Sequence, residues 1–246
     1  MPKSKITDSS VDVIIVGAGF AGMYMLYYLR KKGLKARILE AGDDVGGTWH
    51  WNRYPGARCD VESMAYSYSF DEELQQEWNW STKFSYQPQI LDYLKTVADR
   101  FDLNQDIFLK SRVLSAEYEE GADVWRLRTD SGVEHSAKFC VMATGCLSVP
   151  KDPEIVGLER FEGETFSTWN WPKEKVNFAG KKVGVIGTGS SGVQCIPVIA
   201  TDASHLTVFQ RTPNFSVPAF NRALEKSEVE TVKKNISICE QKRGIR

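Results

Sequence analysis

Near the start of the chain, Gly17, Gly19 and Gly22 stand in the spacing Gly-x-Gly-x-x-Gly, directly after a short apolar run. In a motif of this kind, the first glycine permits a tight turn and the second lets the backbone approach a pyrophosphate. The third lets the following helix pack closely on the strand, and the N-terminus of that helix favours phosphate through its free N–H groups and its dipole. We therefore expect a dinucleotide to bind here.

The same spacing returns in residues 187–192, and the two motifs differ in the charge of a residue further along. Glu40 and Gln210 stand at the same distance from the first glycine of their motifs. A carboxylate at this place suits the two hydroxyls of a ribose, whereas a neutral residue followed by Arg211 suits a ribose that carries a 2′-phosphate. The second motif therefore favours NADP. For Arg211, a surface arginine at the start of a turn is the alternative.

Each motif needs a strand before it, a helix after it and a second strand beside the first. The apolar patterns predict these strands at residues 13–16 and 36–39 for the first motif, and at 183–186 and 206–209 for the second. The first helix is expected to begin at Met23 and to be buried. The second is expected to bend or end near Pro197, because proline cannot donate a helix hydrogen bond.

Between the motifs, three short strands are predicted at residues 112–118, 124–129 and 136–142, separated by glycine-containing turns, which is typical of a β-meander. A helix is predicted from Pro88, since Ile90, Leu94, Val97 and Phe101 fall on one face. The last strand runs into Ala143-Thr144-Gly145, a turn of small residues suited to close approach by a ligand.

Composition limits the class of protein. The net charge is −1 and no long block of one sign occurs, so nothing points to nucleic acid or to a membrane surface. The apolar run of residues 20–29 is too short to span a bilayer, and the first residues lack the apolar core of a signal peptide. The five cysteines have no metal-ligand spacing. We expect a reduced cytoplasmic protein without a metal.

Two dinucleotide sites in one chain, with opposite preferences at the ribose, suggest a flavoprotein reduced by NADPH. We expect a three-layer α/β fold with two Rossmann-like domains and the meander in the first. The predicted boundaries are an FAD-binding domain at 1–148, a linker at 149–178 and an NADP-binding domain at 179–246.

Residues 46–60 contain Gly-Gly-x-Trp, four residues, Tyr-Pro-Gly, three residues and Asp60. This stretch resembles the fingerprint of the type I Baeyer–Villiger monooxygenases. Residues 161–172, which end in Trp171 and Pro172, are similar to the second fingerprint of the same family. The resemblance extends over nearly the whole chain. It implies an enzyme that binds FAD and NADP(H) and inserts one oxygen atom of O₂ beside a ketone carbonyl, through a peroxyflavin, to give an ester or lactone.

The resemblance also implies a set of cofactor-binding residues by matching position. Those expected at FAD are Gly17, Gly19, Phe20, Ala21, Gly22, Glu40, Thr48, Trp49, His50, Trp51, Asp60, Tyr66 and Val113. Those expected at NADP are Arg58, Cys59, Asp60, Thr188, Gly189, Ser190, Ser191, Gly192, Val193, Gln194, Arg211 and Thr212.

By the same resemblance, Asp60 is the predicted catalytic residue. Its carboxylate would orient a cationic partner near the flavin and help to hold NADP in place. The alternative is a carboxylate that only stabilises a turn or caps a helix.

The chain departs from the family pattern at two places. Ser167 replaces a histidine of the second fingerprint, and serine has a shorter reach and no charge switch, so we expect weaker coupling of NADPH use to oxygenation. Family members are also about twice as long, which implies that the C-terminal part of both domains is missing here. Val229, Val232, Ile236 and Cys239 form a helical apolar stripe, and we expect this face to be open. An open face of this kind suggests a fragment, or a partner polypeptide that completes the fold; an independent helical tail is the alternative.

Two other functions remain open. The chain could belong to a flavin monooxygenase that oxidises sulfur or nitrogen, although Trp171 and Pro172 argue against this. It could also be a non-catalytic fragment that binds FAD and NADP.

Overall fold

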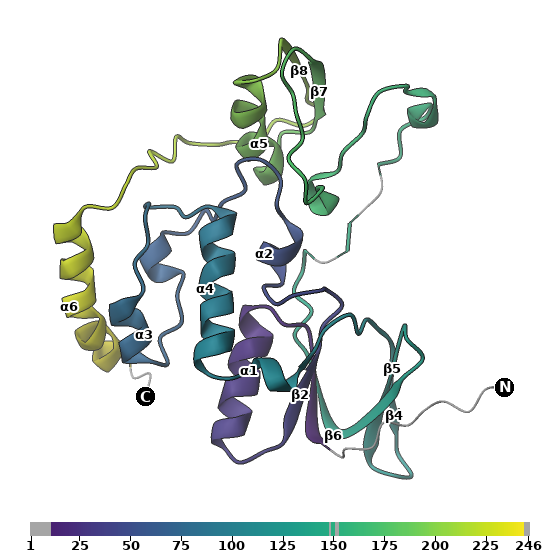
Figure 1. Cartoon of the computed structure of the whole chain (residues 1–246), viewed down its shortest axis with the longest axis vertical. Helices are drawn as coiled ribbons and strands as arrows, with labels where there is room; N and C mark the ends of the chain where they lie inside the picture. Colours follow the sequence, from purple (N-terminus) through teal and green to yellow (C-terminus); the bar gives the residue numbers. More distant parts are fainter. Residues whose placement is uncertain (1–10, 148, 151–152, 244–246) are drawn as a thin grey trace. The chain divides into compact units, whose positions relative to one another are not determined.

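The computed structural model describes residues 11–147, 149–150 and 153–243, and of residues 236–243 the backbone alone. The chain forms two compact units, and Figure 1 shows the elements of both. The first unit contains Met1–Asn52 and Leu91–Trp171, and the second contains Arg53–Ile90 and Pro172–Arg246. The predicted domain boundaries remain a prediction, because these units describe packing and not ligand binding.

The first unit is built on a mixed sheet in the order β3-β2-β1-β6-β5-β4. The strands β3, β2, β1 and β6 are parallel, while β5 and β4 continue the sheet antiparallel. Their bounds are β1 Val11–Val16, β2 Ala36–Leu39, β3 Ile107–Phe108, β4 Val113–Glu119, β5 Val124–Thr129 and β6 Glu134–Met142. The α/β class and the meander are therefore confirmed. The sequence did not reveal that β6 would join the meander to the parallel strands.

The core of this unit forms where β1 lies between β2 and β6. Ile14 and Ile15 have no exposed surface because both faces of β1 are covered. Helix α1, Phe20–Lys31, buries Met23 and Leu26, but Tyr24 and Tyr28 are exposed, so the expectation of a wholly buried helix is wrong. This helix is amphipathic, since only one face meets the sheet. It also begins before Met23, directly after the glycine turn.

Helix α4, Gln87–Arg100, confirms the prediction from Pro88. Its residues from Leu91 onward belong to the first unit, where the ring of Tyr93 lies 6.2 Å from that of Phe20 on α1. Leu94 and Val97 are buried on the same face, as their spacing predicts. The short helix α2, Thr48–Trp51, follows the loop that leaves β2.

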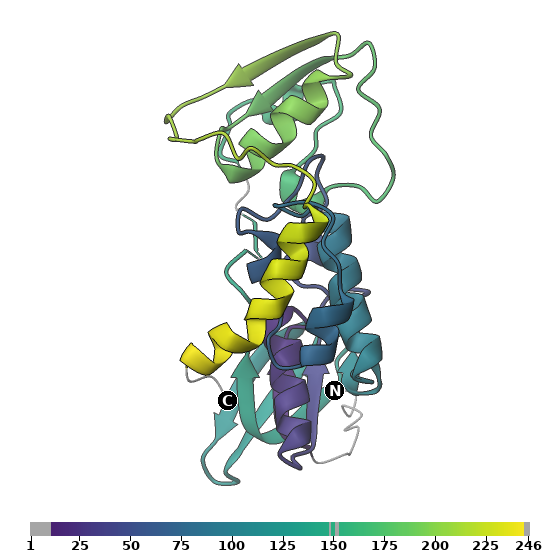
Figure 2. The same cartoon turned by 90° about the vertical axis from the view of Figure 1, so that its left-hand side faces the viewer.

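The second unit contains the repeat of the strand–helix–strand pattern. Strands β7, Lys182–Ile186, and β8, His205–Phe209, are parallel, and α5, Ser190–Ala200, lies on one face of them (Figure 2). The helix continues through Pro197 to Ala200, so the expected end at Pro197 is wrong, while the alternative, a bend there, stays a prediction. Pro197 is exposed, and Cys195 and Ile199 are buried on the opposite face, so packing keeps the helix intact despite one lost hydrogen bond.

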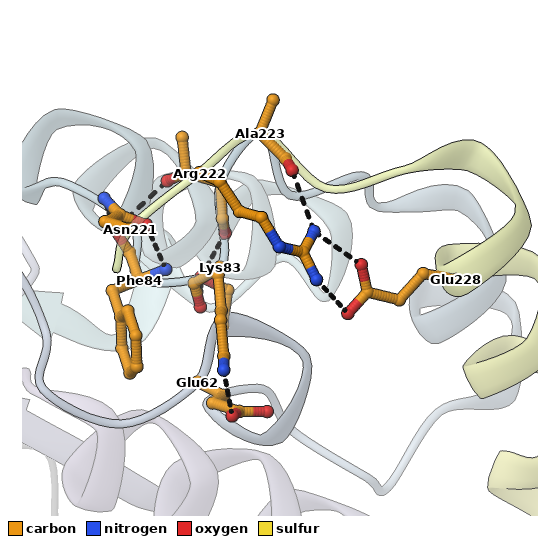
Figure 3. A network of polar contacts seen from close by, with 9 residues as sticks. Glu62, Lys83, Phe84, Asn221, Arg222, Ala223 and Glu228 are labelled. Carbon is orange, nitrogen blue, oxygen red and sulfur yellow. Dashed lines mark hydrogen bonds and ion pairs between the residues drawn. The ribbon is translucent and has the colours of Figure 1, made fainter. Parts of the chain in front are cut away.

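Two sequence-distant parts of the second unit are joined by backbone pairing, shown in Figure 3. Lys83 N–H donates to the Arg222 carbonyl at 2.9 Å, and the Asn221 side chain donates to and accepts from the Phe84 backbone at 3.0 and 2.9 Å. Arg222 also pairs with both carboxylate oxygens of Glu228 at 2.9 and 3.2 Å. Because that ion pair is exposed, the backbone pairing is the more important connection.

Helix α6, Lys226–Arg243, packs beside α3, Glu72–Glu77, in the same unit. Lys233 Nζ donates to the Asn79 side chain at 2.8 Å, and Val229 and Val232 are half-buried. The first turns of the predicted apolar stripe are thus partly covered, which corrects the expectation of an open face. The side chains of Ile236 and Cys239 lie outside the described residues. Within the described ranges, every helix is too short or too polar to cross a bilayer.

Candidate functional site

The first glycine turn is closely packed. Gly17 has φ +105°, and a Cβ there would lie 2.6 Å from the carbonyl oxygen of Ala143, in the small-residue turn after β6. A Cβ on Gly22 would lie 1.9 Å from the Gly17 carbonyl oxygen and 3.5 Å from the Ile15 side chain. The predicted role of Gly22, close packing of helix on strand, is therefore confirmed by its contacts.

The N-terminus of α1 is suited to an anion. Its N-cap, Gly19, has no side chain to accept from the first N–H groups of the helix. Phe20 and Ala21 form the first turn, and Ala21 is exposed. Unsatisfied N–H groups and the positive end of the dipole favour a phosphate at this position.

Glu40 is 4% exposed and already has two partners. Its Oε2 accepts from the Ala18 N–H at 2.6 Å, and its Oε1 accepts from the Gly42 N–H at 2.7 Å. The carboxylate therefore joins the glycine turn to the loop after β2. Each carboxylate oxygen can accept more than one hydrogen bond, so ribose hydroxyls could still bind there.

The loop after β2 crosses the glycine turn. Gly46 N–H donates to the Ala18 carbonyl at 2.9 Å, and a Cβ on Gly47 would lie 2.8 Å from Gly19 Cα. The site residues predicted from the sequence did not include this glycine pair. Two adjacent glycines directly before Thr48 were nevertheless a signal of a close backbone contact, because glycine has no side chain to obstruct one.

The residues after this pair begin α2, and they differ in exposure. Thr48 is exposed, whereas Trp49 and His50 are buried at 7% and 6%. His50 Nε2 lies 3.1 Å from Asp43 Oδ1, and its ring packs edge-on against Trp51. Val113, at the start of β4, packs on the core cluster that includes Leu39. These predicted FAD residues all lie in the first unit, while Asp60 and Tyr66 lie in the second.

The second glycine turn repeats the local geometry in an open setting. Gly187 has φ +100°, and a Cβ on Gly192 would lie 2.4 Å from the Gly187 carbonyl oxygen. By contrast, a Cβ on Gly187 or on Gly189 would meet no atom of the described residues within 4 Å. Gly189 is the N-cap of α5 and has no capping side chain. A phosphate could approach this turn without hindrance.

Polar side chains border the open turn. Gln210 Nε2 donates to Thr188 Oγ1 at 2.9 Å, and Asn214 Nδ2 donates to the Thr188 carbonyl at 3.1 Å. Arg211 and Thr212, which follow β8, are exposed, as are Ser190 and Val193 on α5. The structure therefore brings the end of β8 to the turn, as the motif predicts.

Residues 54–60, here called the fingerprint loop, belong to the same unit as α5. The Arg58 guanidinium lies over the Tyr86 ring at 4.5 Å, and its Nε donates to the Gly56 carbonyl at 3.1 Å. Cys59 is 5% exposed, and burial raises the pKa of its thiol. Asp60 is exposed, and within the described ranges no cationic side chain forms an ion pair with it.

Ser167, the departure in the second fingerprint, is exposed and precedes a short 3₁₀ turn, Thr168–Asn170. Its side chain makes no capping hydrogen bond there. The rings of its neighbours Phe166 and Trp171 lie 5.4 Å apart. Among the described residues, no cluster of three or more His, Cys, Asp or Glu side chains could hold a metal ion.

Comparison with known proteins places this geometry among flavin and nicotinamide enzymes. The family model described as pyridine nucleotide-disulphide oxidoreductase matches residues 14–240. Phenazine N-monooxygenase PhzNO1 of Lysobacter antibioticus is 46% identical over 91% of this chain and 41% of its own length. Cyclohexanone 1,2-monooxygenase of Acinetobacter sp. is 43% identical over 91% of this chain and 41% of its own length.

Solved structures agree. Oxidised steroid monooxygenase bound to NADP is 53% identical, with a TM-score of 0.91 over 95% of this chain and 45% of that one. The complex of OTEMO with FAD and NADP is 39% identical, with a TM-score of 0.89 over 95% of this chain and 45% of that one. The chain thus spans less than half the length of each of these proteins.

Proposed function

This chain belongs to the pyridine nucleotide-disulphide oxidoreductase family, within which it matches the N-terminal part of the Baeyer–Villiger monooxygenases, and we propose that it forms the cofactor-binding part of such an enzyme. The enzyme would use FAD and NADPH to insert one oxygen atom of O₂ beside a ketone carbonyl.

One observation carries the proposal: the two glycine turns have the same local geometry, but the residues that follow the second strand of each motif differ in charge. The first is followed by the buried carboxylate of Glu40, and the second by Gln210 and the exposed Arg211. A carboxylate repels a 2′-phosphate and an arginine attracts one. FAD carries no such phosphate and NADPH does, so each turn fits one of the two cofactors.

The first turn fits FAD by its backbone. Gly17 and Gly22 are closely packed, so there is no room for a ligand beside them. The pyrophosphate would therefore bind at the N-terminus of α1, which has no capping side chain. Glu40 would bind the ribose, while Thr48 and its neighbours Trp49, His50 and Trp51, together with Val113, would line the rest. Since Trp49 and His50 are buried, we propose that they contribute through their backbone and by supporting the loop.

The second turn fits NADPH by its openness. The residues Thr188, Gly189, Ser190, Ser191, Gly192 and Val193 would bind the pyrophosphate at the N-terminus of α5. Arg211 and Thr212 would bind the 2′-phosphate. In the same unit, Arg58 and Cys59 would hold the loop that carries Asp60.

When bound, the flavin supplies the redox chemistry: it takes electrons from NADPH and passes them to O₂. The chain's own residues bind and orient. We propose that the exposed carboxylate of Asp60 pairs with a cation of the longer enzyme and keeps the nicotinamide end of NADP in position, with Tyr66 also at the flavin. Two Rossmann-like domains, completed by further chain, are part of the same proposal.

Oxidation of nitrogen is a second candidate, because the phenazine N-monooxygenase is as similar to this chain as the ketone-oxidising relatives are. Conversion of a cyclic ketone to a lactone, against oxidation of the ring nitrogen of a heteroaromatic compound to its N-oxide, separates the two.

The visible absorption spectrum of the purified chain, loaded with FAD, tests the proposal directly. We expect a bound flavin that NADPH bleaches without oxygen, and that NADH bleaches much less. A folded chain that binds neither FAD nor NADPH would contradict the proposal.

A further inference from the structure

The side chain of Gln194, on α5, is engaged by the fingerprint loop. Tyr54 donates its hydroxyl to Gln194 Oε1 at 2.9 Å, and the Arg58 N–H donates to the same oxygen at 3.1 Å. In return, Gln194 Nε2 donates to the Arg58 carbonyl at 3.0 Å. All three residues lie in the second unit, so one side chain joins two segments that are far apart in the sequence.

The loop backbone lies directly on α5 at the same point. Gly56 has φ +78°, and a Cβ there would lie 2.4 Å from the Gln194 carbonyl oxygen and 2.9 Å from Val198 Cγ2. Tyr54 is 8% exposed, and burial raises the pKa of its hydroxyl, which therefore remains a donor at neutral pH. The Tyr-Pro-Gly part of the fingerprint is thus explained by docking on this helix.

Gln194 also lies close to the open glycine turn. It follows Ser190, the first residue of α5, by one helical turn, and Gly189 is the N-cap of the same helix. In the other direction, its partner Arg58 precedes Asp60 by two residues. Helix α5 is rigid over this distance, since Cys195 and Ile199 anchor it in the core of the unit.

We propose that Gln194 is a positioning residue: it fastens the fingerprint loop to α5, so that a nucleotide bound at the N-terminus of this helix restrains the segment that carries Asp60. The proposal deepens the proposed function and rests on NADP binding at this turn.

A direct contact between the Gln194 side chain and the nucleotide is the competing role. A glutamine amide has two donor hydrogens and an oxygen with two acceptor positions. The loop uses both acceptor positions and one of the hydrogens. Turning the side chain to a nucleotide would take away the acceptor of the Arg58 N–H and leave the Tyr54 hydroxyl with Ser191 alone, which is unfavourable because both groups are partly buried.

The first experiment measures the labelling of cysteines by a thiol reagent, residue by residue, by mass spectrometry. Cys59 is buried in the loop, Cys195 is buried on α5, and Cys146 is exposed and serves as an internal reference. In Gln194→Ala we expect Cys59 to label about tenfold faster, because losing several hydrogen bonds favours local opening, while Cys195 stays protected. Unchanged protection of Cys59 would overturn the proposal, as would equal exposure of Cys195.

Two conservative variants grade the effect. Tyr54→Phe removes one of the three hydrogen bonds, and Gln194→Glu keeps both acceptor contacts but loses the donor, so both should label at intermediate rates. Gln105→Ala is the matched control, since it removes the same side chain and two hydrogen bonds from an exposed turn of the first unit. It should leave the labelling of Cys59 unchanged.

The second experiment adds NADP⁺ and measures affinity and labelling together. In the wild-type chain, NADP⁺ should slow the labelling of Cys59; in Gln194→Ala it should still bind with similar affinity but no longer slow the labelling. If Gln194→Ala loses affinity while Tyr54→Phe keeps both affinity and protection, Gln194 is a direct ligand and the proposal fails. If the wild-type chain does not bind NADP⁺, the proposed function fails with it, whereas the labelling rates without nucleotide still report on the three hydrogen bonds.

Discussion

The two glycine turns share their local structure and differ in everything that surrounds it. In each, the first glycine has a positive φ and donates its N–H to the end of the second strand, Leu39 in one case and Phe209 in the other, at 2.9 Å. The first turn lies under the Ala143 carbonyl and against Gly47, in a sheet of six strands. The second lies beside two strands, and among the described residues no atom would lie within 4 Å of a Cβ on Gly187. The motif therefore specifies a turn, and packing decides how that turn can be used.

The largest effect should come from one substitution made in both turns. Gly17→Ala and Gly187→Ala both place a side chain at positive φ, which costs about 1–2 kcal/mol. Only Gly17→Ala also forces a Cβ against the Ala143 backbone, so its total cost should reach about 3 kcal/mol or more. Urea unfolding of the two variants measures the difference. Equal destabilisation would break the comparison, because it would mean that the crowding is of no consequence.

A second test exchanges the residues that follow the second strands. In Glu40→Gln, the amide NH₂ group replaces one carboxylate oxygen, so either the Ala18 N–H or the Gly42 N–H loses its acceptor. We expect the free energy of unfolding to fall by about 2 kcal/mol and FAD to be retained less tightly. Gln210→Glu lies at an exposed hydrogen bond and should change stability by less than about 0.5 kcal/mol. Instead it should weaken NADPH binding by repulsion of the 2′-phosphate. An effect of Glu40→Gln on stability as small as that of Gln210→Glu would contradict this account.

A third test sharpens the assignment of the second turn. Arg211→Ala should weaken NADP⁺ binding about tenfold, which corresponds to one charge-assisted contact, and leave NAD⁺ binding unchanged. Lys234→Ala, an exposed cation on α6, removes the same charge elsewhere in the unit and should change neither. Calorimetric titration gives the affinities for both nucleotides. An equal loss of affinity for NADP⁺ and NAD⁺ would mean that Arg211 does not bind the 2′-phosphate.

The smallest expected effect is on the pH dependence of the stability of the first unit. Burial, together with the charge of Arg37, lowers the pKa of His135 on β6, whose ring packs on Phe108. The unfolded chain therefore binds more protons than the folded one around and below the ordinary histidine pKa, so stability rises as pH increases through that range. In the wild-type chain the free energy of unfolding should therefore increase between about pH 5 and about pH 7.5, and His135→Gln should make this increase smaller. His205→Gln, at an exposed position of β8, is the control, and a gain unchanged in His135→Gln would refute the assignment.

Much of the fold could be predicted because the strands and helices follow from the periodicity of apolar residues over short stretches of the sequence. The strands around both motifs and the three strands of the meander were placed within about two residues of their observed bounds, which is the accuracy expected for strongly periodic segments. Strand β3 was missed because two residues carry no period. Of the bend or end expected near Pro197, the end was wrong because tertiary packing outweighed the effect of a single residue on the helix.

The candidate site divides in the same way. The sequence by itself determined the two glycine turns, their helix N-termini and the opposite charges of Glu40 and Arg211, because steric limits on φ and the spacing of strand and helix act over a few residues. Only the tertiary structure decided that Glu40 holds the first turn through Ala18, that Ala143 closes over Gly17, and that Gln194 holds the fingerprint loop. Those contacts join residues that are distant along the chain, and no local pattern records which of many possible partners a side chain meets.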